Sequence, residues 1–363
     1  MASLAPRSPG TWHDAPLLAH ATAGRDNNVL AIRFVAAAAV ILFHCYALTD
    51  RWMQEPLYAA LAPLNFGTLG VQVFFVLSGF LVTQSWLARP ALVPFAASRA
   101  LRIYPALVTA TVFTVLVAGA SSALPWSEYL RSPTTWRYVA RTASGIDVVD
   151  RLPGVFPDNP FPHAANGSLW TLPVELRLYV ALGVAGVVGL LVRPRAWLVA
   201  GLGLVAAGLA WPDAVPLDPN TRGTRLAALL FLLGSLACAW QRYLPLSLPA
   251  AALAVALPLV DAHALARDGP LFALLLAYVV LVVAYHPALR IGGLARAPDY
   301  SYGLYVYAFP IQQTIVRAAP DIAPPLLFVL ALAATLAVAA VSWHALEAPL
   351  LRLKSRFGPQ ARR

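Results

Sequence analysis

Arg33 and His44 are the polar residues that stand out in the first long apolar segment of the chain, residues 28–48. They are eleven residues apart, a spacing that on a helix separates them by about 16 Å along the axis and leaves them on one face. Both side chains can therefore line the same cavity, at opposite depths. A neutral imidazole can accept a proton from a hydroxyl near neutral pH, so we assign His44 as a candidate general base.

Glu175 is the second candidate catalytic residue and lies in a later apolar segment, residues 168–191. Counted from a helix start near Ser168, Glu175 lies about 10 Å and His44 about 6 Å below the same surface. We therefore expect the carboxylate to meet the imidazole, orient it and stabilise its cationic form. The alternative is that His44 bonds a neighbouring helix and Glu175 pairs with Arg177, although residues i and i+2 of a helix do not face each other.

Arg99 and Arg102 make an Arg-x-x-Arg pair at the start of another apolar segment. Positions i and i+3 place both guanidinium groups on one side of a helix. Arginine binds phosphate oxygens in a bidentate way, so the pair suits a nucleotide-bearing donor such as coenzyme A. The alternative is that both residues only anchor the cytoplasmic end of a membrane helix.

Several polar side chains within apolar segments are candidates for contact with a substrate. Ser78 and Gly79 form a small pair halfway along one segment, where close helix packing is the commoner explanation in membranes. Gln312 lies deep in residues 301–317 and can bond either a substrate or a neighbouring helix. The residues that we assign to substrate binding are Ser78, Tyr179, Tyr302 and Gln312.

The composition indicates what must position these residues. Of the 363 residues, 60% are hydrophobic and 12% charged, against about a quarter charged in soluble domains, and the mean hydropathy is +0.68. Since a span needs about 20 mainly apolar residues, we predict an all-α integral membrane protein, a bundle of about ten transmembrane helices with an irregular outer cap. The predicted spans are 28–48, 67–88, 99–120, 168–191, 196–211, 222–241, 247–261, 271–285, 301–317 and 324–345.

Loops and charge predict the organisation of the chain. We expect a cytoplasmic N-terminal segment (1–27), a transmembrane domain (28–348) whose outer cap is residues 121–167, and a basic cytoplasmic tail (349–363). With the N-terminus inside, the inner segments carry fifteen positive residues and the short outer loops five. Positive residues concentrate on the cytoplasmic side of membrane proteins, so both termini are expected in the cytoplasm.

The remaining composition argues against other classes of ligand. The net charge is +10, but the basic residues are spread over loops instead of one stripe, so we expect the lipid bilayer and no nucleic acid as partner. Cys45 and Cys238 both fall within predicted spans and have no metal-ligand spacing, so no metal is expected. Whether the chain forms a homo-oligomer is left open.

Five sequence elements in the same order resemble the acyltransferase 3 family of membrane O-acyltransferases, and the resemblance runs from end to end. Arg33 and His44 fit the family's Arg-x10-His spacing. One departure is Ala308, which stands where many relatives carry a histidine. The other four elements are residues 70–80, Arg99 with Arg102, residues 170–175, and residues 300–305 with 347–349.

The resemblance implies a function and roles for the candidate residues. It implies that acetyl-CoA is the acyl donor, used from the cytoplasm, that Arg33, Arg99 and Arg102 help hold it, and that His44 is the catalytic base with Glu175 beside it. A second departure is the lack of a fused extracellular domain like that of some relatives, so we expect a stand-alone form, in the bacterial inner membrane. We expect acetyl transfer to a hydroxyl of an extracytoplasmic carbohydrate, such as a cell-surface or exported polysaccharide.

One alternative function comes from another class of protein. A multi-span transporter could use Arg33, His44 and Glu175 as a proton relay. Transporters usually have paired halves with interrupted helices at matching positions, and the sequence has no such symmetry. For the acyltransferase, we further expect Trp126 and Trp136 of the outer cap to stack on the sugar.

Overall fold

The computed structural model describes residues 15–24, 26–210, 221–260, 269–293 and 297–354. These residues form helices and isolated β-bridges, with no strand among them, so the all-α prediction is confirmed. A helix occupies each of the ten ranges predicted as spans. These helices are α2 (Val29–Ala47), α4 (Phe66–Ala88), α5 (Leu92–Gly119), α8 (Thr171–Val187), α9 (Pro194–Ala210), α10 (Thr221–Ala239), α11 (Leu248–Val260), α12 (Pro270–Tyr285), α13 (Ser301–Ala318) and α14 (Pro324–Ser342).

Five segments of the described chain are long and apolar enough to cross a membrane, so by this measure the count of ten is not confirmed. α9 to α12 contain shorter apolar stretches, and α13 is buried along most of its length. The five segments are Val29–Ala47, Phe66–Ala88, Leu92–Gly119, Gly167–Val187 and Pro324–Arg352.

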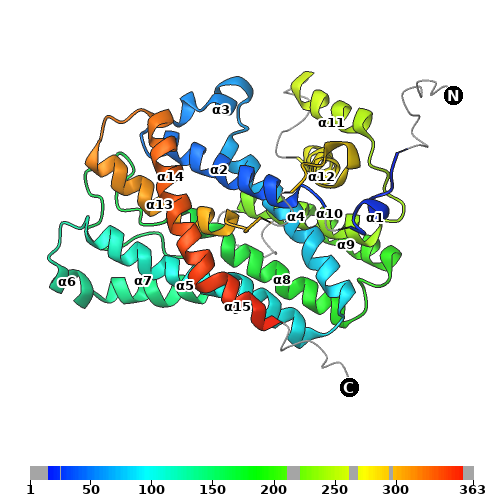
Figure 1. Ribbon diagram of the computed structural model, residues 1–363, viewed down its shortest axis with the longest axis horizontal. Coiled ribbons are helices and arrows are strands. Elements are labelled where there is room, and N and C mark those ends of the chain that lie inside the picture. Colours follow the sequence, from blue (N-terminus) through cyan, green and yellow to red (C-terminus); the bar gives the residue numbers. More distant parts are fainter. Residues whose placement is uncertain (1–14, 25, 211–220, 261–268, 294–296, 355–363) are drawn as a thin grey trace.

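α5 begins at Leu92, not at residue 99 as expected. The helix continues through Arg99 and Arg102 because their side chains turn toward the interior of the bundle, where they line a cavity. The two arginines are therefore held by regular helix on both sides. Figure 1 shows α5 and α8 running along one side of the molecule, with α2 and α4 crossing near its middle.

α4 is packed against α10 through glycines that bring the two backbones into contact. A Cβ atom on Gly79 would lie 1.9 Å from the carbonyl oxygen of Phe231, and one on Gly234 would lie 2.1 Å from that of Val76. Small residues allow such close approach between membrane helices. The packing interpretation of the Ser78–Gly79 pair is confirmed for its glycine.

We expect Gly79→Ala to destabilise the bundle by about 1–3 kcal/mol, because the added methyl group meets backbone that can yield only if α10 moves. Thermal unfolding of the purified protein in detergent measures this loss. Gly203→Ala in α9 is the matched control: its Cβ would meet nothing within 4 Å, and alanine favours a helix more than glycine does. Equal melting temperatures for both variants would contradict the packing argument.

The outer cap, residues 121–167, is more regular than predicted. It contains α6 (Trp126–Arg131) and α7 (Pro133–Ser144), which lie at one end of the molecule, opposite α1 (Leu18–Ala21) (Figure 1). Fully buried Tyr129, Tyr138 and Phe156 give this cap a core of its own, packed on the end of α5. Burial of these aromatic side chains against α5 stabilises α6 and α7.

The predicted division of the chain at residues 27 and 348 stays a prediction. Part of the N-terminal segment packs on the bundle, since the amide of Leu18 donates to the carbonyl of Leu244 and that of Ala19 to the carbonyl of Gln241, both at 2.9 Å. At the other end, α15 (Ala348–Arg352) follows a π-helical turn at Trp343–Glu347. Residues 1–14 and 355–363 lie outside the described residues.

Candidate active site

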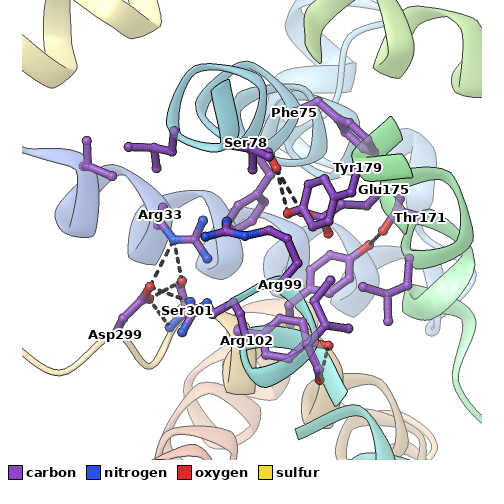
Figure 2. Close-up of a pocket in the computed structure, with 18 of the residues that line it drawn as sticks. Arg33, Phe75, Ser78, Arg99, Arg102, Thr171, Glu175, Tyr179, Asp299 and Ser301 are labelled. Carbon is purple, nitrogen blue, oxygen red and sulfur yellow. Dashed lines mark hydrogen bonds and ion pairs between the residues drawn. The ribbon is translucent and has the colours of Figure 1, made fainter. Parts of the chain in front are cut away.

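A cavity of about 300 Å³ in the bundle brings together most of the predicted site residues, and we call it the basic cavity. α2, α4, α5, α8 and α13 supply most of its wall. Figure 2 shows the arginines converging on its centre, with Ser78, Glu175 and Tyr179 across from Asp299 and Ser301. The polar residues lining the basic cavity are Arg33, Ser78, Arg99, Arg102, Thr171, Glu175, Tyr179, Asp299, Ser301, Tyr302, Tyr305 and Lys354.

Asp299 fixes two of the three arginines. Its Oδ2 lies 2.6 Å from Nη2 of Arg102 and 3.3 Å from Nε of Arg33, and Ser301 donates hydrogen bonds to its other oxygen. Burial raises the pKa of Asp299, but the two guanidinium groups and the hydrogen bonds from Ser301 outweigh burial and hold the pKa below its usual range. Asp299 is therefore an anion that orients Arg33 and Arg102.

Arg99 has a different environment. Its guanidinium carbon lies 6.0 Å from the ring centre of Tyr179, and its Nε donates to Ser98 at 3.2 Å. Among the described residues it forms no ion pair with a carboxylate. Its charge is therefore available to a ligand in the basic cavity.

Lys354 adds a fourth cation to the same wall. Burial lowers the pKa of Lys354, and the charges of Arg99 and Arg102 lower it further, to about 8. The lining then carries four formal positive charges against the two carboxylates of Asp299 and Glu175, an excess of two. The basic cavity is thus built for an anion with more than one charge.

Glu175 lies across the basic cavity from these cations and is bound to two hydroxyl groups. Ser78 donates to Oε1 of Glu175 at 3.0 Å, and Tyr179 donates to the same oxygen. The two hydroxyl oxygens are 2.9 Å apart. Tyr302 donates to the carbonyl of Ile103 at 3.1 Å. The predicted residues Ser78, Glu175, Tyr179 and Tyr302 therefore share one cavity with the three arginines.

His44 lines a second cavity of about 360 Å³, which we call the histidine cavity. Its Nδ1 lies 3.5 Å from Oγ of Ser168, and the ring of Phe309 packs edge-on at 5.2 Å between ring centres. No lining residue of this cavity is Asp, Glu, Lys or Arg in the described chain. The residues lining it are Val40, Phe43, His44, Pro63, Leu64, Gly67, Thr68, Val71, Gln72, Ser168, Trp170, Gly223, Leu226, Ala227 and Tyr305.

The expected contact between His44 and Glu175 is not present, because the two residues line different cavities. The expected contact assumed that a single α-helix begins near Ser168. The structure instead has a 3-10 turn at Gly167–Trp170 before α8. That turn brings Ser168 to His44, while Glu175 faces Ser78. Val71 and Tyr305 line both cavities, so these two side chains form part of each wall.

Gln312 lies outside both cavities. Its side chain is fully buried and donates to the carbonyl of Ile41 at 2.8 Å and to Sγ of Cys45 at 3.0 Å. Gln312 therefore bonds a neighbouring helix, which was the alternative to substrate binding. Trp126 and Trp136 of the cap also line neither cavity, whereas Trp170 lines the histidine cavity.

Comparison with known proteins places this chain in a family. The acyltransferase 3 family, described as an acyltransferase domain, matches residues 27–344. The chain is 29% identical to an O-acetyl transferase of Shigella phage Sf6 over 78% of this chain and 84% of that protein. It is 33% identical to the exopolysaccharide production protein ExoZ of Rhizobium meliloti over 79% and 90%.

A third relative covers nearly the whole chain. Nodulation protein 10 of Rhizobium leguminosarum bv. viciae is 28% identical over 92% of this chain and 95% of its own length. No solved structure matches the chain significantly. The family match includes Arg33, His44 and Glu175, and covers the lining of both cavities except Lys354. The chain therefore belongs to the acyltransferase 3 family and is an acyltransferase.

Proposed function

We propose that the protein is a membrane O-acetyltransferase that takes an acetyl group from acetyl-CoA and transfers it to a hydroxyl of an extracytoplasmic carbohydrate. The observation that carries the proposal is the pair of cavities that share Val71 and Tyr305 in their walls, one rich in cations and the other holding His44. The relatives' names, an O-acetyl transferase and an exopolysaccharide production protein, support the reaction and the class of acceptor.

The basic cavity is the proposed donor site. Coenzyme A carries phosphate groups, and arginine side chains bind phosphate through charge-assisted, bidentate hydrogen bonds. Arg99 and Lys354 bring charge to this site, while Asp299 holds Arg33 and Arg102 in place. The phosphates would bind among these side chains, and the flexible pantetheine arm would extend toward Val71 and the histidine cavity.

The histidine cavity is the proposed acceptor site, and His44 the general base. The acceptor hydroxyl gives its proton to the imidazole as its oxygen attacks the thioester carbonyl. The carbon–sulfur bond then breaks, the acetyl group is left on the carbohydrate, and coenzyme A leaves as a thiolate that takes up a proton. Ser168 is placed to orient the ring through Nδ1, which makes it a positioning residue.

We infer ten membrane crossings with both termini in the cytoplasm, in a bacterial inner membrane. The excess of positive residues in the inner segments supports this orientation. It places Arg99, Arg102 and Lys354 near the cytoplasm, where acetyl-CoA is made, and the outer cap on the far side. The transporter alternative has no support from the comparisons, since the family match describes an acyltransferase domain.

The direct test incubates membranes containing the protein with acetyl-CoA labelled in the acetyl group and with a panel of glycans. Base-labile label on a glycan supports O-acetylation, because esters hydrolyse in base. Membranes from cells without the protein are the control. Failure of the purified protein to bind acetyl-CoA would overturn the proposed function.

Val71→Phe is expected to lower acetyl transfer by at least about tenfold, because Val71 lines both cavities and the larger ring would block the path that we propose for the pantetheine arm between them. Val71 is half-buried and packs against the hydrophobic core, so thermal unfolding must show that the variant keeps its fold. The measurement is the rate of transfer at saturating acetyl-CoA, with donor affinity determined separately. Val35→Phe is the control, since Val35 lies on the outer face of α2 with 64% of its surface exposed.

Lys354 is expected to make donor binding depend on pH. Its pKa of about 8 lies below the ordinary value, and bound phosphate would favour the charged form. The dissociation constant of acetyl-CoA should thus stay nearly constant up to about pH 7 and rise by up to roughly tenfold by pH 9, as the free lysine loses its proton. Calorimetric titration at pH 7 and 9 measures the change. Lys354→Met should bind more weakly at pH 7 and lose the pH dependence, and a flat profile for the unaltered protein would contradict this role.

A further inference from the structure

Gln72 is a buried polar residue in the wall of the histidine cavity that the proposed mechanism leaves unused. It lies on α4 with 7% of its surface exposed, and its Oε1 has no hydrogen-bond partner among the described residues. Buried polar side chains are nearly always hydrogen-bonded, and an unpaired amide oxygen costs stability. The oxygen has almost no accessible surface in this conformation, so a ligand in the cavity would supply the missing partner once the amide turns toward it.

The surroundings of Gln72 limit the chemistry of that ligand. Among the described lining residues, His44 is the one basic side chain, and the other polar groups are the hydroxyls of Thr68, Ser168 and Tyr305, the indole of Trp170 and the amide of Gln72. An ionised ligand group would find no opposite charge among the described lining residues, and burying an unpaired charge is costly. The basic cavity, with its four cations, shows the contrasting design for an anion.

Trp170 is a second lining residue whose chemistry suits a sugar. It lines the histidine cavity from the turn that precedes α8, on a different element from Gln72. An indole offers a broad apolar face, and a pyranose ring has apolar C–H faces together with hydroxyl groups at its edge. An aromatic face and an unpaired amide in one uncharged cavity therefore match such a ring.

We propose that Gln72 is an acceptor-binding residue, that it hydrogen-bonds a hydroxyl of the acceptor sugar other than the one that reacts, and that the sugar held there is uncharged. The terminal torsion of a glutamine is soft, so the amide can turn toward the occupant of the cavity. The inference rests on the proposed function and extends it, because it names the class of acceptor and a residue that selects it. Holding a second hydroxyl would also fix which hydroxyl faces His44.

The experiment uses the purified full-length protein with acetyl-CoA and the methyl glycosides of glucose, galactose and mannose as neutral probes. Methyl glucuronoside, with a carboxylate, is the charged probe. Gln72→Leu keeps the size of the side chain and removes its amide. We expect the unaltered protein to prefer neutral probes by at least about tenfold, and Gln72→Leu to raise their KM roughly ten- to a hundredfold with the Kd for acetyl-CoA unchanged.

Monodeoxy derivatives of the best neutral probe separate recognition from structure. The unaltered protein should lose affinity for the derivative that lacks the hydroxyl bound by Gln72, while Gln72→Leu should no longer distinguish it from the parent sugar. A merely structural role would lower the rate with every probe equally. Gln54→Leu, on an exposed turn, controls for the loss of a glutamine.

The outcomes distinguish this inference from the proposed function. The inference is overturned if the protein acetylates the probes but prefers the glucuronoside. It is also overturned if Gln72→Leu leaves every KM unchanged, because Gln72 then does not bind the acceptor. If the protein binds acetyl-CoA yet acetylates none of the glycosides, the carbohydrate acceptor is overturned as well. Failure to bind acetyl-CoA removes the proposed function itself.

Discussion

His44→Ala is expected to lower acetyl transfer by at least about a hundredfold while leaving the affinity for acetyl-CoA unchanged. General-base catalysis contributes roughly 10²- to 10⁴-fold, and the alanine variant leaves the acceptor hydroxyl without a base. Donor affinity should persist because His44 lines the histidine cavity, whereas the four cations line the basic cavity. Transfer of labelled acetyl groups and calorimetric binding of acetyl-CoA give the two numbers.

Two further variants sharpen this prediction. His20→Ala alters an exposed histidine on α1 and should retain full activity. Ser168→Ala removes only the group beside Nδ1 and should reduce the rate less than His44→Ala does. Full activity of His44→Ala in correctly folded protein would show that the base lies elsewhere, and equal loss of donor binding and of rate would show that the two cavities do not act separately.

The convergence of the three arginines could be predicted, but their partner could not. Spacing along one helix places Arg99 and Arg102 on one side, and the shared depth of Arg33 follows from its position in α2. Asp299 is 197 residues from Arg102, and no local pattern reports so distant an ion pair. The sequence points to Asp299 only through its position directly before residues 300–305, which resemble a sequence element of the family.

Depth along a helix was easier to predict than the direction of a side chain. Counting residues placed His44 and Glu175 at similar levels, yet the turn at Gly167–Trp170 shifted the register of α8 and turned Glu175 toward α4. Gln312 was predicted to lie within an apolar helix and is fully buried there, but it faces α2 and not a cavity. Such directions depend on helix packing, which a hydropathy pattern does not contain.

The helices themselves were the most predictable part of the fold, because long apolar runs between polar breaks mark them directly. Their ends were less so. α5 begins earlier than its charges suggested, because Arg99 and Arg102 find a polar cavity inside the bundle. The helices of the cap depend on burying Tyr129 and Tyr138 against α5. These contacts cannot be predicted from a segment that is rich in proline and polar residues.

Arg99→Ala and Arg102→Ala are expected to fail in different ways, although the two residues are one helical turn apart. Arg99 has no carboxylate partner among the described residues, so its loss should raise the Kd of acetyl-CoA roughly ten- to a hundredfold with little change in stability. Arg102 neutralises Asp299 at 2.6 Å, with both side chains more than four-fifths buried. Its loss should lower the free energy of unfolding by about 1–3 kcal/mol as well as weaken donor binding.

Calorimetry for the Kd and thermal unfolding in detergent for the stability separate the two variants. Arg195→Ala, at an exposed position on α9, should change neither quantity. Arg99→Lys keeps the charge but loses the planar fork, so it should restore donor binding only in part. Asp299→Asn should relieve Arg102→Ala, because the double variant no longer buries a carboxylate with one partner missing. Were Arg99→Ala and Arg102→Ala to match in both measurements, the separation of a ligand-binding arginine from a structural one would be wrong.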